Sequence, residues 1–259
     1  MKVSRVFIGF WWISFSVLSA ENNPGTENST AADSSAHIHI SYIVKTGIGH
    51  GELNETVDIN QESDVHTFSI TSNAQATGIF KIINPGSIIR SSQGIVTEKG
   101  LKPTRYSDQR TNSNSSLALF DWEKEILTLK HGTEEKQTPL QAGTLDRLSL
   151  SYHFIFSCTH ELQAGNLLGI HVTDGRSLQL MQFKISSEKL STPLGELDTI
   201  VLTKLRNSDD KIQRKIWLAP DYHMIPVHIQ SVEKDGLDVD KMIAELHIDY
   251  ATDITCCTQ

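Results

Sequence analysis

Apolar and polar residues alternate with a period of two in one short segment after another from His37 onward. In MIAELHIDYAT (242–252), the alternation predicts Met242, Ala244 and Leu246 on one face and Ile243 on the other. Successive side chains of a β-strand point to opposite faces, so a sheet with one buried apolar face and one solvent-exposed face is expected. The same alternation, or a short β-rich run, occurs in HIHISYIVK (37–45), HTFSITS (66–72), SIIRSS (87–92), SLALFDW (116–122), EILTLKHG (125–132), LLGIHVTDG (167–175), SLQLMQFKI (177–185), DTIVLTKLR (198–206), KIWLAP (215–220) and IPVHIQSVE (225–233).

Short polar links with glycine or aspartate separate these segments and favour tight turns. They are EKG (98–100), KHGTEE (130–135), TDGR (173–176), NSDD (207–210) and EKDG (233–236). Links of this kind join antiparallel neighbours rather than parallel strands with helical crossovers. A sheet of about 11 to 14 strands curls or closes. The expected fold class is therefore mostly β, an antiparallel meander curled into an incomplete or closed barrel.

One segment, TLDRLSLSYHFIF, has helical periodicity and predicts one main α-helix near residues 144–156. Thr144 is the expected N-cap, with Asp146 in the first turn. The helix is expected to cover a sheet edge or to fill the concave side. SNAQATGIF (72–80) fits either a second helix or a strand. One face of the main helix would carry Leu145, Leu148, Ser149, Tyr152 and Phe156.

Residues 1–20 have the features of a secretory signal peptide, with Lys2 and Arg5 before an apolar run and small residues at its end. The run is too short for a membrane span, which needs about 20 residues, and no cysteine follows it for lipid attachment. We expect a periplasmic protein that is not a lipoprotein, cleaved after Ser19 or Ala20, with no stable membrane span afterwards. The expected divisions are a disordered mature N-terminus (21–36), a single antiparallel β domain (37–251) and a C-terminal tail (252–259).

The charge of the chain argues against nucleic acid as a partner. Removing residues 1–20 changes the formal net charge from −8 to −10. An acidic protein repels phosphate backbones, and no basic stripe is evident in the sequence. Gly47, Gly49 and Gly51 are not followed by an amphipathic helix, so they do not form a dinucleotide-binding fingerprint. No cofactor is expected.

The three cysteines allow two interpretations. Cys158 ends an apolar run, whereas Cys256 and Cys257 are adjacent near the C-terminus. In an oxidising compartment, a disulfide from Cys158 to one tail cysteine would pin the C-terminus to the core. The alternative is a buried Cys158 thiol and a disordered tail. An adjacent pair has neither redox CxxC spacing nor a zinc ligand set.

Catalytic and metal-binding arrangements find little support in the sequence. Asp146, Ser149 and His153 match a hydrolase triad in type, but no GxSxG elbow is present. His37 with His39, or His228 with His247, supply too few metal ligands, so no metal site is expected. We expect no enzyme. The remaining hydrolase hypothesis requires convergence of Asp146, Asp174, Asp221 and either His223 or His228.

The chain contains five spaced motifs: FDW (120–122), GTLDRLSLSYHF (143–154), TDGR (173–176), STPLGEL (191–197) and WLAPDYHMIPVHI (217–229). Together they resemble the domain of unknown function 3108 family, which comprises exported proteins mostly of Gram-negative bacteria. The resemblance spans about residues 40–250, and SSQGIVTEKGLKPTRY (91–106) also fits it. It implies an antiparallel β protein of the periplasm, and it implies no catalytic residue set.

The family-motif residues are interpreted as structural. Aromatics beside Asp121 would pack on one face, Asp174 and Gly175 would form a hairpin turn, and Pro220 would end a strand. Asp146 would support the helix start or pair with an arginine. The complete set is Phe120, Asp121, Trp122, Asp146, Ser149, Asp174, Gly175, Arg176, Thr192, Pro193, Gly195, Trp217, Pro220, Asp221 and Pro226.

These observations leave three hypotheses for function. The first is a non-enzymatic binding or carrier protein whose concave β surface holds a lipid or another apolar, envelope-derived ligand. The second is a structural module that docks on a cell-envelope protein. The third is the envelope hydrolase described above.

Overall fold

The computed structural model describes residues 35–250, except 48, 63, 78–85, 112, 158–161, 207–211 and 233–235. The predicted signal peptide and all three cysteines lie outside the described residues. No helix among the described residues is long and apolar enough to cross a membrane.

The described strands form one sheet in the order β8-β7-β6-β5-β4-β3-β2-β1-β15-β14-β13-β12-β11-β10-β9. Every neighbouring pair is antiparallel except β9 with β10, which is parallel. The strands are β1 (Ala36–Thr46), β2 (Gly49–Glu62), β3 (Val65–Ala76), β4 (Ser87–Thr97), β5 (Gly100–Arg110), β6 (Ser116–Asp121), β7 (Ile126–His131), β8 (Glu134–Pro139), β9 (Leu145–Asp146), β10 (Leu167–Thr173), β11 (Leu178–Thr192), β12 (Gly195–Lys204), β13 (Gln213–Ala219), β14 (Ile225–Val232) and β15 (Asp238–Tyr250).

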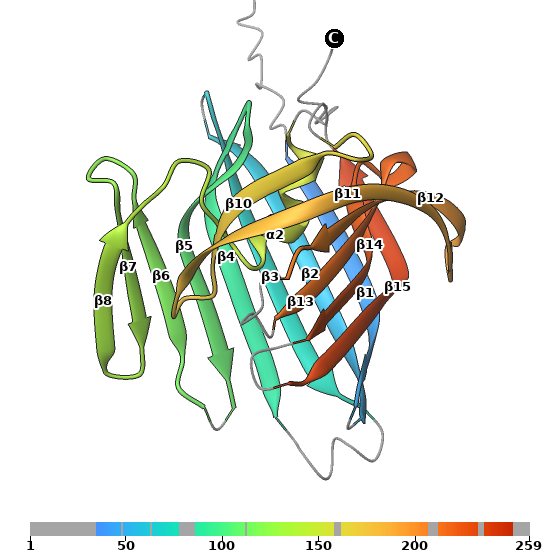
Figure 1. Cartoon of the computed structure of the whole chain (residues 1–259), viewed down its shortest axis with the longest axis horizontal. Coiled ribbons are helices and arrows are strands. Elements are labelled where there is room, and N and C mark those ends of the chain that lie inside the picture. Colours follow the sequence, from blue (N-terminus) through green and yellow to red (C-terminus); the bar gives the residue numbers. More distant parts are fainter. Residues whose placement is uncertain are drawn as a thin grey trace, which may run out of the picture. The chain divides into compact units, whose positions relative to one another are not determined.

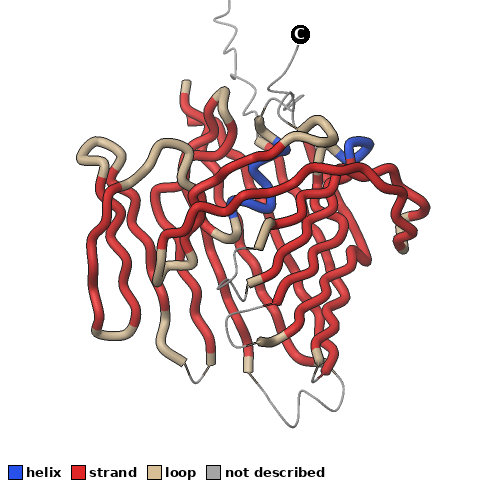
Figure 2. The backbone as a smooth tube through the Cα atoms, viewed as in Figure 1, coloured by secondary structure: helices blue, strands red, loops and turns tan. Residues whose placement is uncertain are grey.

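The sheet is strongly curved but not closed, since β8 and β9 are its two edges. Figure 1 shows β10 and β11 crossing in front of β3 to β5, and Figure 2 shows how little of the backbone is helical. The predicted mostly-β, antiparallel, barrel-like fold is confirmed. Alternation did not identify β2, β5 and β8 as strands, and residues 72–76 belong to β3 rather than to a helix.

The helical segment is shorter than predicted. It consists of α2 (Ser149–Tyr152) and the 3-10 turn η1 (His153–Ile155), and it follows the short strand β9. Thr144 does not cap it; the carboxylate of Asp146 accepts hydrogen bonds from the backbone N–H groups of Leu148 and Ser149 instead. Pairing of β9 with β10 and this tight turn together hold residues 145–148 out of a helix. As expected, the segment lies on the concave side, where Tyr152 and Phe156 join the core.

Buried apolar side chains of the described residues form two clusters. The larger draws mainly on β1 to β7 and includes Ile40, Tyr42 and Val57, whereas the smaller draws mainly on β10 to β14 and includes Phe183 and Leu202. Residues of the α2 segment contribute to both clusters. This segment therefore ties the two halves of the curled sheet together.

A β-bulge in β15 changes which residues face the inside. The pairing with β1 steps from Ser41↔Glu245 to Tyr42↔Ile243, so Ala244 has no partner in the ladder. The extra residue reverses the alternation. Ile243, rather than Met242, is consequently buried, and the prediction that Met242 shares the inner face with Leu246 is wrong.

Candidate functional site

The curled sheet encloses a cavity of about 470 Å³, which we call the concave cavity. Its lining comes from β1 to β5 on one side and β13 to β15 on the other, with residues around α2 between them. The two groups are contiguous in the sheet, because β1 pairs with β15, and the curvature of these consecutive strands forms the cavity wall. The apolar part of the lining consists of Val44, Leu53, Ala74, Ala76, Ile88, Leu148, Ile229, Leu237 and Val239.

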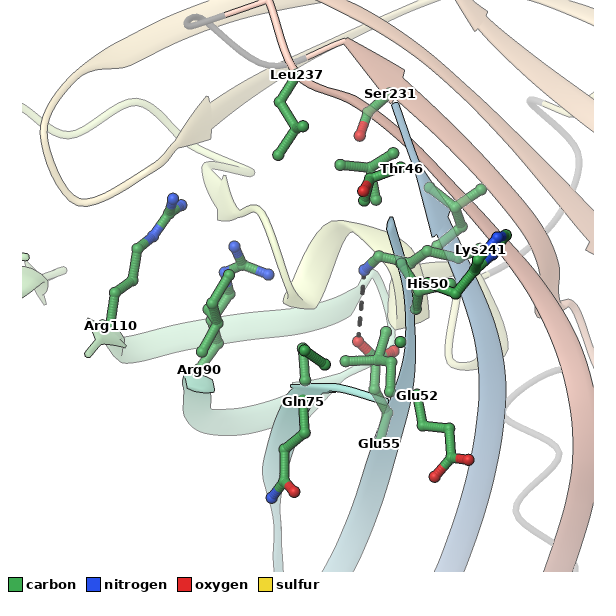
Figure 3. A pocket seen from close by; sticks show the side chains of 18 of the residues that line it. Thr46, His50, Glu52, Glu55, Gln75, Arg90, Arg110, Ser231, Leu237 and Lys241 are labelled. Carbon is green, nitrogen blue, oxygen red and sulfur yellow. Dashed lines mark ion pairs between the residues drawn. The ribbon is translucent and has the colours of Figure 1, made fainter. Parts of the chain in front are cut away.

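Four arginines and one lysine also line the concave cavity, and we call them the cationic cluster. Each comes from a different element: β4, β5, the turn between β9 and α2, β13, and β15. In Figure 3, Arg90, Arg110 and Lys241 extend toward the same space from different strands, whereas the carboxylate of Glu52 points away. The members of the cationic cluster are Arg90, Arg110, Arg147, Arg214 and Lys241.

Glu55 is the buried acidic partner on this inner surface, with 2% of its surface exposed. It accepts a hydrogen bond of 2.8 Å from the hydroxyl of Ser72 and another from the hydroxyl of Tyr152. The ammonium group of Lys241 lies 3.8 Å from the same carboxylate. Glu55 thereby connects β2, β3, β15 and α2 through polar contacts.

Burial lowers the pKa of Lys241 to about 8. The carboxylate of Glu55 opposes this shift, but the positive charges of Arg90, Arg214 and Arg147 reinforce it. Burial, with Glu55 nearby, also raises the pKa of Tyr152 well above its ordinary value. The bulge at Ala244 is what directs Lys241 into this environment, because Lys241 pairs with the inward-facing Val44.

Asp108 holds two members of the cationic cluster in place. Its carboxylate lies 3.1 Å from Nε of Arg90 and 3.2 Å from a terminal guanidinium nitrogen of Arg110. Burial opposes ionisation of Asp108, but the two arginines outweigh it and keep the pKa of Asp108 below its usual value. Arg90 and Arg110 are thus oriented before any ligand is present.

Asp146 anchors the turn that carries Arg147 to the concave cavity. Its side chain is fully buried and accepts hydrogen bonds from the hydroxyls of Ser92 (2.6 Å) and Ser149 (2.8 Å), besides those from the two N–H groups. Burial raises the pKa of Asp146, and these hydrogen bonds oppose the rise. Ser149 and Asp146 are therefore neighbours through turn geometry.

His153 does not complete a triad with Ser149 and Asp146. Its Nδ1 accepts a hydrogen bond of 3.2 Å from the backbone N–H of Leu101. Burial lowers the pKa of His153 to about 4, so the ring is neutral at pH 7. The ring serves to join η1 to β5.

The aromatic residues of the FDW motif pack on one face of β6 and its turn. Phe120 and Trp122 stack with ring centroids 5.9 Å apart, and the indole N–H of Trp122 donates to the carbonyl of Pro103 at 2.6 Å. Asp121 accepts from the backbone N–H of Lys124 at 3.0 Å and pairs with the Lys124 ammonium at 2.8 Å.

The TDGR motif lies beside the turn at Asp146 and Arg147, because Arg147 donates its backbone N–H to the carbonyl of Thr173. Asp174 accepts from the backbone N–H groups of Arg176 and Ser177 at 2.9 and 2.8 Å. Gly175 has a positive φ of 81° and lies against β6, where an added Cβ would be 2.9 Å from Cβ of Ser116. A second cavity, of about 230 Å³, includes Asp174 and Arg176 and shares Arg110, Arg147 and Arg214 with the concave cavity.

In the STPLGEL hairpin, the hydroxyl of Thr192 donates to the carbonyl of Gly195 at 2.9 Å and accepts from the N–H of Leu194 at 3.1 Å. Pro193 lies in the turn itself, and Gly195 has a φ of 120°. These residues shape the link between β11 and β12.

The WLAPDYHMIPVHI segment forms β13, a 3-10 turn (η3, Pro220–Tyr222) and β14. Trp217 stacks on His228, with ring centroids 4.2 Å apart, and His228 contacts Asp240 at 2.9 Å. Asp221 is exposed in the turn, whereas Pro226 lies within β14, where its carbonyl accepts a 2.7 Å hydrogen bond from Tyr42.

The residues required by the hydrolase hypothesis have separate surroundings. Asp146 contacts Ser92, Asp174 contacts its own hairpin turn, and His228 contacts Asp240. No group of three or more metal-ligating side chains occurs in the described part of the chain. Sequence reasoning did not identify the cationic cluster, whose members are scattered from residue 90 to residue 241.

The sequence matches the family model described as Protein of unknown function (DUF3108) over residues 37–242. A search of curated proteins finds no significant relative. Among solved structures, a β-barrel-like DUF1849 protein from Brucella abortus is 8% identical, with a TM-score of 0.49, over 84% of this chain and 98% of its own. A domain from Vibrio parahaemolyticus, named for outer membrane lipoprotein sorting, is 7% identical with a TM-score of 0.23 over 84% and 88%. The family match covers most of the chain, and the protein therefore belongs to the DUF3108 family.

Proposed function

We propose that the protein is a non-enzymatic binding or carrier protein that holds an apolar or amphipathic ligand in the concave cavity. The observation that carries the proposal is the cavity of about 470 Å³, with its apolar lining beside a few polar groups. Cavities that bind small molecules usually measure about 300–1,000 Å³ and have this composition. The hydrogen-bonded strands that line the cavity would contact a bound molecule from several sides.

The polar groups near the cavity support binding over catalysis. Glu55, Asp108 and Asp146 all accept hydrogen bonds from neighbouring side chains, and these contacts hold the inner surface together. A hydrolytic site needs a nucleophile and a base that face a common space. Ser149, the serine of the candidate triad, instead donates to Asp146 within a buried turn.

The proposal also includes export to the periplasm, on the basis of the signal-like residues 1–20. Amino-terminal sequencing of the mature protein is expected to begin at Ala20 or Glu21. Detection of Met1 at the amino terminus of the protein recovered from cells would contradict export with cleavage.

The experiment that tests binding compares two tryptophan substitutions on β3. Ala74 lines the concave cavity, whereas the neighbouring Asn73 is exposed on the opposite face. The neutral fluorescent probe N-phenyl-1-naphthylamine is expected to bind the unaltered protein and the Asn73→Trp variant. Ala74→Trp is expected to abolish binding, since the indole would occupy the cavity.

Circular dichroism and thermal unfolding of both variants would establish that each remains folded. Probe binding that is equal in the two folded variants would place any apolar site elsewhere. Absence of binding to the unaltered protein would refute the proposal.

The alternative of docking on an envelope protein receives less support from the sheet edges. The edge strand β8 carries Glu134, Glu135 and Lys136 as exposed residues. Charged side chains on an edge discourage pairing with another strand. The other edge, β9, has only two residues and is buried.

A further inference from the structure

We infer that the ligand of the concave cavity is an amphiphile with one anionic head group, a carboxylate or a phosphate, which the cationic cluster binds. The inference rests on the proposed function and adds the chemical class of the ligand. The hydrocarbon part would contact the apolar lining, and the head group would contact arginine and lysine side chains.

The distribution of charge is the first argument. The chain has 31 acidic and 23 basic residues, so an inner surface rich in cations runs against its composition. Four arginines and a lysine nevertheless line the concave cavity, together with Glu52 and with Glu55, which contacts Lys241. Asp108 pairs with Arg90 and Arg110 beside the cavity, so these five cations outnumber the three carboxylates. This excess of positive charge matches an anionic ligand, because guanidinium groups form bidentate hydrogen bonds with carboxylates and phosphates.

The partial burial of these cations is the second argument. The side chains of Arg90 and Lys241 are 14% and 17% exposed, and Arg214 is 8% exposed. Removing charges from water is unfavourable unless opposite charges lie close by. The lowered pKa of Lys241 has the same origin, since burial and the neighbouring arginines both disfavour its charge. Asp108 and Glu55 supply opposite charges to Arg90 and Lys241, and an anionic group in the cavity would add to them.

The division of the lining is the third argument. Ile88 and Arg90 face the cavity from successive inward positions of β4, and Val239 and Lys241 do so from β15. On both β4 and β15, an apolar and a cationic side chain therefore lie next to each other in the lining of the concave cavity. An amphiphile would contact both the apolar lining and the cationic side chains, whereas a purely apolar ligand or a small anion would match only one of them.

The second cavity gives the head group room to extend. It shares Arg110, Arg147 and Arg214 with the concave cavity, and its remaining lining includes Ser177 and Gln179. Hydroxyl and amide groups at this end suit a phosphate ester better than a bare hydrocarbon. A larger head group can therefore occupy this space while its chain stays in the concave cavity.

The test is competition against the neutral probe N-phenyl-1-naphthylamine by three ligands that share one hydrocarbon chain. Oleate carries a carboxylate, oleoyl lysophosphatidate carries a phosphate, and oleyl alcohol carries no charge. Both anions are expected to displace the probe at concentrations at least about tenfold lower than the alcohol, as one charge-assisted hydrogen bond allows. The difference between the two anions separates a free fatty acid from a phospholipid as the source of the head group.

Variants assign the preference to the cationic cluster. Lys241→Gln and Arg214→Gln are each expected to reduce the preference for oleate over oleyl alcohol by about tenfold while the neutral probe still binds. Lys184→Gln, an exposed lysine on β11, serves as the matched control and is expected to leave the preference unchanged.

Equal displacement by oleate, lysophosphatidate and oleyl alcohol would overturn the inference and leave the proposed function standing. A charge preference that survives both cavity substitutions would overturn it as well. Failure of the probe to bind the unaltered protein would instead refute the proposed function.

Discussion

Replacement of Asp146 by alanine is expected to destabilise the protein severely and to abolish ligand binding with it. The carboxylate accepts hydrogen bonds from the hydroxyl of Ser92 and from the backbone N–H groups of Leu148 and Ser149, at 2.6, 2.8 and 2.9 Å. All three donors would lose this partner at a site with 0% exposure. The hydroxyl of Ser149 keeps an alternative acceptor, the carbonyl oxygen of Asp146, at 3.3 Å.

A buried donor without a partner costs about 1–3 kcal/mol, so three such donors lower the free energy of unfolding by about 3–6 kcal/mol after partial relaxation. That is a large part of the roughly 5–15 kcal/mol that stabilises a typical domain. Urea unfolding followed by circular dichroism would measure the loss as a lower midpoint at an unchanged slope. Probe binding should fall in parallel, because the turn at Asp146 carries Arg147 and Leu148 to the cavity.

Asp174→Ala provides the matched control, because Asp174 also accepts from two backbone N–H groups and one hydroxyl. Its side chain is 13% exposed, so water can replace some of these contacts, and a loss of about 1–2 kcal/mol is expected. Equal losses in the two variants, or a loss below about 1 kcal/mol for Asp146→Ala, would refute the view that burial makes this aspartate an anchor.

Three further outcomes are expected. Gly175→Ala should destabilise the protein by about 1–3 kcal/mol in urea unfolding, because φ is positive and the added Cβ would be too close to Ser116. Gly195 also has a positive φ but has open space around it, so Gly195→Ala should destabilise the protein less. Between pH 8 and pH 10 the unfolded chain keeps a proton on Lys241 that the folded protein has lost. The free energy of unfolding of the unaltered protein should therefore rise with pH relative to that of Lys241→Gln. If the difference between the two proteins does not change over this pH range, the lowered pKa is refuted. Trp217→Phe should raise the pKa of Glu188 in an NMR titration, since the indole N–H donates to that carboxylate and is the main cause of its lowered pKa; an unchanged pKa would contradict this.

Most strands with regular alternation could be predicted from the sequence, whereas β2 and β8 could not. In β2 the inward positions are Leu53, Glu55 and Val57, so a buried carboxylate interrupts the apolar pattern. In β8 most positions are exposed, which leaves no alternation to detect. Alternation is therefore hard to detect where a buried charge interrupts it, as in β2, or where most positions are exposed, as in β8.

The helix shows how tertiary contacts override a periodic pattern. Leu145, Leu148 and Tyr152 are buried, as helical spacing suggested. However, Leu145 and Asp146 pair with β10, and the Asp146 carboxylate closes a turn before α2 begins. The spacing identified the correct apolar residues and the wrong backbone conformation for the first of them.

The cationic cluster could not be predicted because its members meet only through curvature and irregular pairing. Arg90 within SIIRSS was the one local signal, a charge at the inward position between Ile88 and Ser92. Lys241 reaches the cavity because of the bulge at Ala244, and regular alternation assigned the opposite face.

Native mass spectrometry of the protein purified without detergent from its own cell envelope tests ligand binding in the cavity most directly. The unaltered protein and Asn73→Trp are expected to carry an added mass, released on denaturation, from an amphiphile with a carboxylate or phosphate. Ala74→Trp is expected to be recovered without it. Recovery of the unaltered protein at the mass of its polypeptide alone, or an equal load on Ala74→Trp, would contradict a ligand in the concave cavity.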